Sequence, residues 1–513
     1  MSPKINTLKL EAMRQLRQRR LAAASKLYDR VLQLAPADED ALAIRAQLSL
    51  AQADYSRAAG YLARLIAIKP ASPDLYFKQG VALQSLGKVE EAEAAYRKAV
   101  AINRDHAVAS YNLGTTLQAQ NKNSEAVVAF ERAVSSKPEF ALAYYNMGIS
   151  LRAIGKCAAA IEAHRRAIEL DPTYADAHAE LASLLQNAAR LEDSVTAYRS
   201  AIKLKPSDAG YYSGLGVTMY HMGRPDDAIG YYQKALLIDS GLAKAHWNLS
   251  LAYLLLGRFT EGWREYEWRK QCGIADRRYP TPGWEGRSLK GKTLLIYGEQ
   301  GIGDELMFAS CYRDLINIAD HVVIDCEPRL KVLMRRSFPD STVHAAREET
   351  ASERRVDLGP VDYVVAAGSI PRYLRPGIDA YPDTVAYIEA DPVLVSKCRN
   401  RLRSLGDSIK VGIAWRGGST ALTRALRSIP LKEWAQILKT KGASFVSLQY
   451  GDNSVEIAEI RRRFGEVIHV WEDLDQFQDV NNFAAQIAAL DLVISIDNTT
   501  VHMAGSLGVP TWV

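Results

Sequence analysis

Two short polar segments in the second half of the chain combine residue types that bind phosphate-linked groups. The first runs from Gly298 to a carboxylate, Asp304, directly after an apolar run. The second runs from Asp497 to His502 and also follows an apolar run. Glycine lets a backbone approach a ligand closely, and a helix that starts at such a turn presents unpaired N–H groups to an anion. The second segment therefore predicts a site for a phosphate-containing ligand, whereas the glycine turn of the first segment is a weak signal by itself.

Arginine residues strengthen this prediction for the second segment. Arg416, Arg424 and Arg427 follow an apolar run that ends at Trp415. Guanidinium groups bind phosphate through paired, charge-assisted hydrogen bonds, so we expect a diphosphate between these cations and the helix start. Each residue also has a simpler role open to it, such as capping a helix, packing in its first turn or carrying a solvated charge. The residues expected to contact the ligand are Arg416, Arg427, Asp497, Asn498, Thr499, Thr500 and His502.

The glycine turn formed by Gly298, Gly301 and Gly303 leaves two interpretations of Asp304 open. A carboxylate at the start of a helix stabilises the positive end of the helix dipole. A carboxylate on a glycine turn beside a cleft is also placed to act as a general base. A dinucleotide-binding fold ranks below these, because the spacing is Gly-x-x-Gly-x-Gly and Asp325 is the only candidate for a ribose contact.

Apolar runs indicate the strands that must position these residues. The runs lie at residues 293–297, 321–325, 362–365, 410–415, 445–449, 466–470 and 492–496. Continuous apolar runs that alternate with helical stretches predict parallel strands buried on both faces, hence two doubly wound α/β units. In the common strand order, the first and fourth strands of the second unit lie side by side. The segments at 415–420 and 497–502 then meet at its switch point, where ligands bind.

The first half of the chain is built on a repeat of 34 residues. Small residues recur at this interval from Ala46 to Gly216 and from Ala58 to Ala228, and prolines close most of the blocks. This pattern resembles the tetratricopeptide repeat, in which two helices form a pair and the pairs stack as an α-solenoid. We expect the small residues where the two helices of a pair cross. Four aromatic residues are expected to pack against the next repeat: Tyr96, Phe130, Tyr198 and Tyr232.

The resemblance to tetratricopeptide repeats also implies a partner. Asn112, Asn146 and Asn248 recur two residues before the small position of their blocks. In that family such asparagines can face a concave groove and hold the backbone of an extended peptide. The resemblance therefore implies a peptide or protein partner in the groove, which the periodicity alone does not show.

Three segments of the second half resemble one group of enzymes. Residues 301–305, 424–430 and 490–497 together with His502 are similar to the heptosyltransferase-like glycosyltransferases of the GT-B fold, over roughly residues 291–513. The resemblance implies that Asp304 is the base for the acceptor hydroxyl and that Arg427 binds the donor diphosphate. It implies a nucleotide-diphosphate sugar as donor and no metal or other cofactor. Joined to repeats, the architecture is similar to that of the enzymes that attach N-acetylglucosamine to protein serines and threonines.

These patterns predict an ordered set of domains. We expect eight repeats over residues 5–276, a linker over 277–290, an acceptor-side α/β domain over 291–409 and a donor-side α/β domain over 410–513. Four tryptophans near the linker are expected to join the repeats firmly to the next domain. The chain ends in the expected fifth strand of the donor-side domain, so we expect this domain to be incomplete compared with the resembling enzymes, whether as a natural fragment or with a reduced donor pocket.

Composition excludes several other classes of protein. The net charge is only +5 over 513 residues and the one short basic run lacks interleaved aromatics, which argues against nucleic-acid binding. Five scattered cysteines predict neither a disulfide framework nor a zinc site, and the acidic pair at 473 and 475 indicates a solvated loop. No uncharged run is long enough to span a membrane, and no secretory segment opens the chain, so we expect a cytoplasmic protein.

Two functions remain open. One is a glycosyltransferase that moves a sugar from a nucleotide-diphosphate donor to a protein or saccharide acceptor presented by the repeats. The alternative is a non-catalytic scaffold, in which the repeats bind partner peptides and a degenerate glycosyltransferase domain only supports them.

Overall fold

The chain divides into two compact units. One consists of Met1–Leu185 with Arg199–Pro206, and the other of Gln186–Tyr198 with Ser207–Val513. The computed structural model describes residues 3–274, 279–345, 360–383, 386–418, 420–465 and 467–513. The expected domain boundary at 276, Ser419 of the expected phosphate loop and the start of the expected strand at Glu466 lie outside the described residues.

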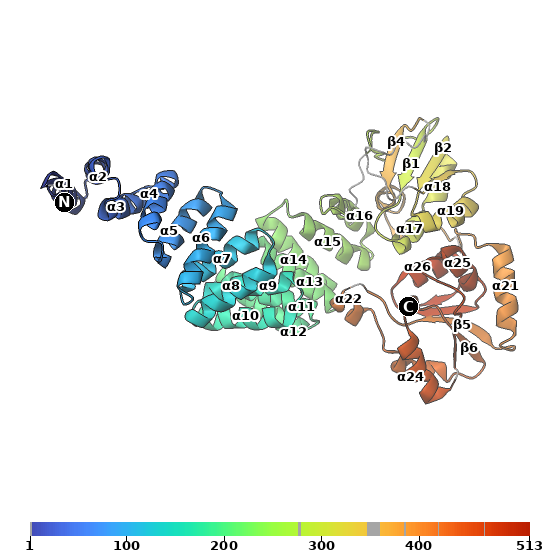
Figure 1. The fold of residues 1–513 in the computed structure, drawn as a ribbon. Coiled ribbons are helices and arrows are strands. Elements are labelled where there is room, and N and C mark those ends of the chain that lie inside the picture. The colour runs from blue at the N-terminus through green and yellow to red at the C-terminus, as the bar shows by residue number, and fades with distance from the viewer. Residues whose placement is uncertain (1–2, 275–278, 346–359, 384–385, 419, 466) are drawn as a thin grey trace. The chain divides into compact units, whose positions relative to one another are not determined.

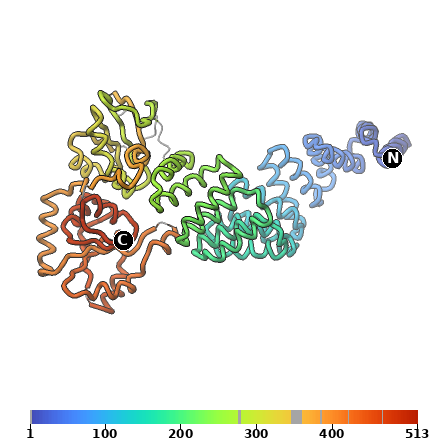
Figure 2. Tube along the Cα trace, turned by 180° about the vertical axis from the view of Figure 1, so that it is seen from behind, coloured from blue at the N-terminus to red at the C-terminus, as the bar shows by residue number. Residues whose placement is uncertain are grey.

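The first half of the chain folds into consecutive helices, coloured blue to green in Figures 1 and 2. Sixteen of them occur in the described residues before the first strand. Their bounds are α1 Pro3–Arg17, α2 Leu21–Leu34, α3 Glu39–Ala51, α4 Tyr55–Ile68, α5 Pro73–Ser85, α6 Val89–Ile102, α7 Ala107–Ala119, α8 Asn123–Ser136, α9 Ala141–Ala153, α10 Cys157–Leu170, α11 Ala175–Asn187, α12 Leu191–Leu204, α13 Ala209–His221, α14 Pro225–Ile238, α15 Ala243–Leu255 and α16 Phe259–Tyr266. A 3₁₀ helix, η1 Glu267–Lys270, follows. The predicted helical repeats are confirmed for this half.

Glycines allow the two helices of a pair to approach closely. A Cβ atom at Gly114 of α7 would lie 2.5 Å from Cε1 of Phe130 of α8, whose ring is fully buried. Tyr96 and Tyr232 likewise lie against the glycine 16 residues earlier in the same pair. The sequence predicted that these aromatic rings pack against the next repeat. It missed their contact with the glycine of the same helix pair. Tyr198 does contact a glycine of the following pair, as predicted.

The second unit contains a parallel sheet of four strands in the order β3-β2-β1-β4. Its elements are β1 Thr293–Tyr297, α17 Ile302–Ala309, α18 Tyr312–Ile318, β2 His321–Asp325, η2 Pro328–Leu330, α19 Lys331–Ser337, β3 Thr342–His344, β4 Tyr363–Ala366, η3 Ala367–Ser369, α20 Pro371–Leu374, η4 Ile378–Ala380 and α21 Pro392–Arg403. The apolar runs predicted β1, β2 and β4. They missed β3, because an edge strand of three residues is too short to produce a recognisable run.

A second parallel sheet of five strands follows in the order β7-β6-β5-β8-β9. Its elements are β5 Ile409–Ala414, α22 Ala421–Leu426, η5 Leu431–Trp434, α23 Ala435–Leu438, β6 Ala443–Ser447, α24 Ser454–Phe464, β7 Ile468–His469, α25 Val480–Ala488, β8 Leu492–Ser495, α26 Thr499–Ser506 and β9 Thr511–Trp512. The first and fourth strands pair directly, with Val411 opposite Leu492, so the predicted neighbourhood of β5 and β8 is confirmed.

The segment between the repeats and the first sheet packs along β4. The N–H of Trp284 donates to the carbonyl of Val364 at 2.8 Å, and the Trp284 ring is buried in the same hydrophobic core as Trp263 of α16. Trp268 stacks instead on His246, with ring centroids 3.9 Å apart. The expected joining of repeats and α/β fold by tryptophans therefore rests on Trp263 and Trp284, with Trp247 packed against the same core. Trp284 and Leu289 of the segment predicted as a linker lie in this core.

Candidate functional site

The turn after β1 and the turn after β8 meet at the starts of two helices. α17 and α26 pack against each other. A Cβ atom at Gly303 would lie 3.0 Å from Cδ2 of His502 and 3.5 Å from Cα of Thr499, so a glycine at this position lets the two helix starts come together. The structure thus joins the two polar segments that the sequence singled out.

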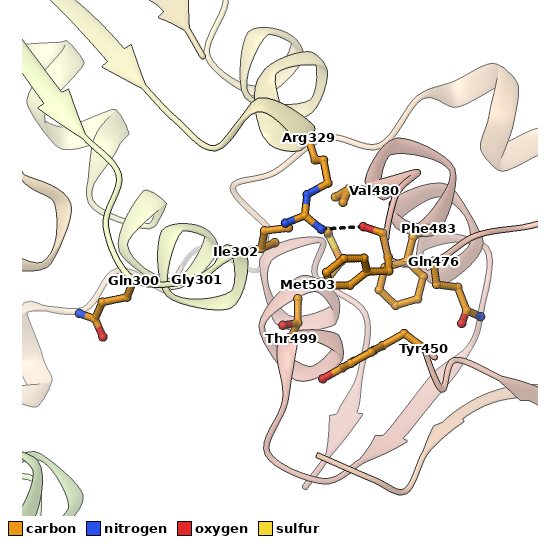
Figure 3. A pocket seen from close by; sticks show the side chains of 11 residues that line it. Gln300, Gly301, Ile302, Arg329, Tyr450, Gln476, Val480, Phe483, Thr499 and Met503 are labelled. Atoms are coloured by element: carbon orange, nitrogen blue, oxygen red, sulfur yellow. Dashed lines mark hydrogen bonds between the residues drawn. The ribbon is translucent and has the colours of Figure 1, made fainter. Parts of the chain in front are cut away.

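A cavity of about 230 Å³ lies beside these helix starts, at the carboxyl ends of the parallel strands (Figure 3). Its walls combine apolar side chains with a few polar groups, as in many small-molecule sites. In Figure 3, Ile302 approaches from the first sheet and Tyr450 and Phe483 from the second. The lining residues are Gln300, Gly301, Ile302, Arg329, Tyr450, Gln476, Phe477, Val480, Phe483, Thr499 and Met503.

Asp304 lies in the first turn of α17 and caps it. Its Oδ2 accepts the N–H of Gly301 at 3.1 Å. Burial raises the pKa of Asp304 above its ordinary value, although the Gly301 N–H and the nearby His502 oppose the shift. A carboxylate with a raised pKa is a stronger proton acceptor. The geometry therefore fits the helix-cap role and leaves the general-base role available to the same side chain.

The start of α26 is capped by Asn498. Its Oδ1 accepts the N–H of Thr500 at 2.9 Å and the hydroxyl of Ser495 at 3.1 Å. The helix-capping role left open for these residues therefore falls to Asn498, which lies between Asp497 and Thr499. Thr500 is fully buried, while Thr499 faces the cavity and Asp497 is exposed.

Two of the three predicted cations, Arg416 and Arg427, contact acidic or carbonyl groups of the protein. Nε of Arg427 is 3.4 Å from Oδ2 of Asp497, an exposed ion pair that contributes little to stability. Arg416 contacts Glu456 at 3.0 Å and donates to the carbonyl of Asp452 at 2.7 Å. A second cavity, of about 500 Å³, is lined by Arg416, Gly417, Gly418, Arg424, Gln449, Tyr450 and Gly451. Tyr450 borders both cavities, so the two are neighbours.

The sequence did not identify Arg329 and Phe477 as site residues. Nη1 of Arg329 donates to the carbonyl of Phe477 at 2.9 Å, and its guanidinium lies 4.5 Å from the centroid of the Phe477 ring. This contact joins the loop after β2 to the loop after β7. Asp475 orders the second loop by accepting the N–H groups of Phe477 and Gln478. The position of Arg329, four residues beyond the end of β2, is the signal that could have identified it.

Gly298 and Asp325 have structural roles. A Cβ atom at Gly298 would overlap the carboxylate of Glu305, a buried side chain that accepts the N–H of Glu327 at 2.9 Å. Asp325 is buried at the end of β2 and accepts a hydrogen bond from Tyr279 at 3.3 Å. The carboxylate considered as a ribose contact therefore has a partner within the protein.

The three asparagines expected in the peptide groove are half-buried. Two of them form hydrogen bonds with other residues of the first unit. Nδ2 of Asn112 donates to the hydroxyl of Tyr96 at 3.4 Å. Nδ2 of Asn146 donates to the hydroxyl of Tyr111 at 3.0 Å. Asn248 is also half-buried, on α15 of the second unit. The structure thus shows two of the three amides anchored on tyrosines of neighbouring helices.

The described parts of the chain contain no arrangement typical of a metal site, a disulfide or a membrane-spanning helix. There, no three His, Cys, Asp or Glu side chains gather as a metal ion would require. The five cysteines are free thiols. Among the same residues, no helix is long and apolar enough to cross a membrane.

The first half of the chain matches family profiles of tetratricopeptide repeats. One, described as tetratricopeptide repeat, matches residues 9–73 and 111–175; another of the same description matches 73–106 and 209–242; a third, described as TPR repeat, matches 190–223. The first half therefore carries tetratricopeptide repeats, an α-solenoid of the expected kind.

Several known proteins are similar to parts of the chain. Protein FlbA of Caulobacter vibrioides is 37% identical over 270 residues, which are 50% of this chain and 45% of FlbA. The match thus spans about half of that curated relative. YrrB, a tetratricopeptide repeat protein with an unusual peptide-binding site, is 23% identical over 36% of this chain and 95% of its own, with a TM-score of 0.34. MamA is 27% identical over 34% and 94%, with a TM-score of 0.32.

Proposed function

We propose that the chain transfers a sugar from a nucleotide-diphosphate donor to a hydroxyl group of a protein or saccharide that the repeats hold. The observation that supports this most directly is the packing of the start of α17, which carries Asp304, against the start of α26, beside one cavity. A proton acceptor and an anion-binding helix start are the two parts that such a transfer needs.

The proposed reaction is a single displacement at the anomeric carbon of the donor sugar. The acceptor oxygen forms the new bond to this carbon while its proton passes to the carboxylate of Asp304. The bond between the anomeric carbon and the diphosphate oxygen breaks, and its electron pair leaves with the nucleoside diphosphate. Since Oδ2 of Asp304 accepts the Gly301 N–H, we assign the proton to Oδ1. Attack opposite the leaving group inverts the configuration of the sugar.

The leaving diphosphate carries a negative charge that the protein must offset. The positive end of the α26 dipole and the guanidinium of Arg427 are proposed for this purpose, with His502 beside them. Arg427 would exchange its exposed partner Asp497 for the diphosphate. This exchange costs little, because an exposed ion pair contributes only about 0 to 1 kcal/mol.

The non-catalytic scaffold is a second candidate, and two observations favour it. The repeats are the part of the chain that family profiles match. In addition, Arg416 and Arg427, the cations named for the diphosphate, are both engaged with acidic or carbonyl groups of the protein. In this version the repeats bind a peptide and the α/β units bind no donor.

A ligand screen separates the two candidates. A donor that binds only the folded protein raises its melting temperature, so ADP, UDP and GDP sugars are tested in turn by thermal shift. With the best ligand, Arg427→Ala and His502→Ala should each weaken binding by about 1.5 to 3 kcal/mol, as expected for a lost charge-assisted hydrogen bond. Arg461→Ala, on the exposed face of α24, is the matched control and should bind normally.

Each outcome of the ligand screen favours one of the two candidates. Binding that survives both substitutions would place the donor elsewhere on the protein. A melting temperature that no nucleotide sugar raises would favour the scaffold. Release of nucleoside diphosphate from the bound sugar by the parent chain, but not by Asp304→Asn, would support the transferase.

A further inference from the structure

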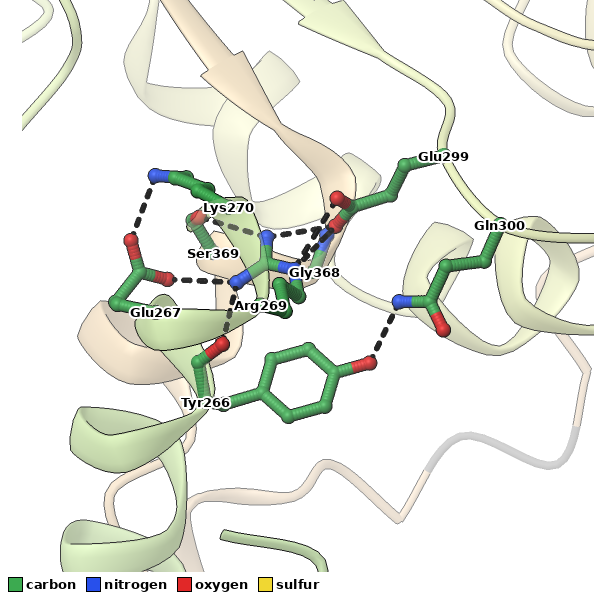
Figure 4. A network of polar contacts seen from close by, with 8 residues as sticks. All are labelled: Tyr266, Glu267, Arg269, Lys270, Glu299, Gln300, Gly368 and Ser369. Carbon is green, nitrogen blue, oxygen red and sulfur yellow. Dashed lines mark hydrogen bonds and ion pairs between the residues drawn. The ribbon is translucent and has the colours of Figure 1, made fainter. Parts of the chain in front are cut away.

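The last turn of the repeats is tied to the glycine turn by a buried polar network (Figure 4). Arg269 of η1 is fully buried. Its Nη2 and Nε contact the carboxylate of Glu299, the second residue after β1, at 2.7 and 3.1 Å. Nη1 donates to Glu267 at 3.0 Å and Nη2 to the hydroxyl of Ser369 at 3.0 Å. A buried guanidinium is tolerated only when its donors are satisfied in this way.

Glu299 is held on its other side by the first sheet. Its Oε1 accepts the N–H of Gly368 at 2.7 Å, and a Cβ atom at Gly368 would overlap this oxygen. Burial opposes the charge on Arg269, yet the neighbouring carboxylate of Glu299 raises the pKa of the guanidinium. The side chain of Glu299 therefore has one position, which fixes the direction in which the chain leaves β1.

The next residue, Gln300, has a left-handed backbone with φ of +63°. A residue with a Cβ atom adopts this conformation only when its surroundings hold it there. Here the side-chain amide of Gln300 donates to the hydroxyl of Tyr266, at the end of α16, at 2.7 Å. Burial raises the pKa of Tyr266 to about 12, so this hydroxyl stays neutral. Figure 3 shows the Gln300 side chain directed away from the other residues that line the cavity.

The backbone at 299–301, which these contacts fix, continues directly into the candidate site. Gln300 and Gly301 line the cavity, and Gly301 is the residue whose N–H the Asp304 carboxylate accepts. A change in the backbone at 299–301 would therefore move Asp304 as well. We propose that Tyr266 and Arg269, near the end of the repeats, are positioning residues for the glycine turn and its carboxylate. The proposal rests on the proposed function for its catalytic meaning, but the positioning itself is measurable without a substrate.

The test uses the mildest available change, Tyr266→Phe, in the full chain. Hydrogen exchange measured by mass spectrometry on the segment 298–308 should become about fivefold faster, since one hydrogen bond that holds the turn is lost. Tyr253→Phe is the matched control, because the hydroxyl of Tyr253 also accepts a hydrogen bond from a glutamine amide, that of Gln233, at 3.2 Å. This control should leave 298–308 unchanged.

Gln300→Gly sharpens the test. Glycine adopts the left-handed conformation without an anchor, so Tyr266→Phe should have no further effect on the exchange of 298–308 in this background. An equal effect of Tyr266→Phe with and without Gln300 would overturn the proposal. So would unchanged exchange in Tyr266→Phe, or exchange that rises equally throughout the α/β units, which would indicate a docking role alone.

A second readout separates this proposal from the proposed function. If the parent chain transfers sugar, Tyr266→Phe should lower kcat several-fold and leave donor binding unchanged. If the parent chain transfers none but the exchange result holds, the proposed function fails and the positioning of the turn stands. Transfer with normal kcat and normal exchange in Tyr266→Phe would reject the positioning role and leave the transferase intact.

Discussion

The two halves of this protein use glycine to make room for different kinds of side chain. In the repeats, Gly80, Gly114 and Gly216 leave space for an aromatic ring of the partner helix. In the α/β half, Gly298 and Gly368 leave space for the buried carboxylates of Glu305 and Glu299. The first use recurs at multiples of 34 residues and builds an apolar core. The second occurs at two glycines without periodic spacing and makes room for buried polar groups.

This difference shows where the molecule tolerates change. A repeated apolar contact is shared among many similar pairs, so the loss of one lowers stability by a limited amount. A buried charge pair has no duplicate, and removing one partner leaves the other in an environment that disfavours it. The following predictions test this comparison.

The largest effect is expected at the buried ion pair of the α/β half. Arg269→Met leaves the carboxylate of Glu299 buried without its main partner and should lower the free energy of unfolding by about 3 to 5 kcal/mol. Urea denaturation followed by tryptophan fluorescence reports this loss, because Trp263 and Trp284 lie in the adjoining core. Arg224→Met, which breaks an exposed pair with Asp227, is the control and should cost less than about 1 kcal/mol. Equal losses in both variants would contradict the comparison.

The next effect depends on pH and lies in the repeats. His164 occupies the position that Phe130 holds in the preceding pair, and its ring lies against Gly148. Burial lowers its pKa from 6.5 to about 4, and the charge of Arg152 adds to this. The folded state therefore binds the proton less readily than the unfolded state. The free energy of unfolding is therefore fully retained above pH 6.5, where His164 is neutral in both states. It decreases by about 3 kcal/mol as the pH falls towards 4.

Substitution isolates this effect. His164→Phe should remove the acid sensitivity of the first unit between pH 6.5 and 4, since phenylalanine has no proton to bind and fits the same contact in the preceding pair. Urea titrations followed by circular dichroism at several pH values measure it. Parallel pH profiles for the parent and the variant would show that another group is responsible.

A pair of glycine substitutions tests the packing of the repeats directly. Gly114→Ala places a methyl group against Phe130 and should destabilise the first unit by about 1 to 3 kcal/mol. Gly60→Ala, in an exposed helical position with nothing within 4 Å, should stabilise it by up to about 1 kcal/mol. Thermal unfolding of the two variants should therefore shift in opposite directions. Shifts of the same sign would show that close approach at Gly114 is not required.

The smallest effect on stability is expected at Asp304. Its pKa is raised, so the folded state binds the proton more readily, and this contribution to stability falls as the pH rises above 3.8. Asp304→Asn should therefore be as stable as the parent at pH 7, or up to about 1 kcal/mol more stable, while losing all proposed transfer. Asp391, which caps α21, has a lowered pKa, so Asp391→Asn should instead lose stability at pH 7. A clear loss of stability in Asp304→Asn would reduce Asp304 to a structural cap.

Much of the fold followed from the sequence because its signals are local or periodic. Apolar runs gave the positions of β1, β5 and β8, and the common strand order gave the neighbourhood of β5 and β8. These sequence patterns did not predict contacts between residues that lie far apart in the chain. The loop carrying Phe477 meets Arg329 across 148 residues, and no local pattern marks such a pair.

The candidate site was predicted in part for the same reason. The turn at 298–304 and the segment 497–502 were recognisable from residue type and spacing, but the cap at Asn498 depends on where α26 begins. The partners of Arg416 depend on how the loops after β5 and β6 close. Side-chain contacts of this kind are set by backbone geometry, which residue types alone leave open.

The sequence by itself determined the repeats, the positions of most strands and the two polar turns, because periodicity and apolar runs act through neighbouring residues. Only the tertiary structure decided that these turns face each other across Gly303, and that the repeats hold one of them through Arg269 and Tyr266. Arg269 and Glu299 are 30 residues apart, and Ser369 lies 100 residues beyond Arg269. A buried charge finds its partners only after the chain has packed, so their meeting follows from the fold.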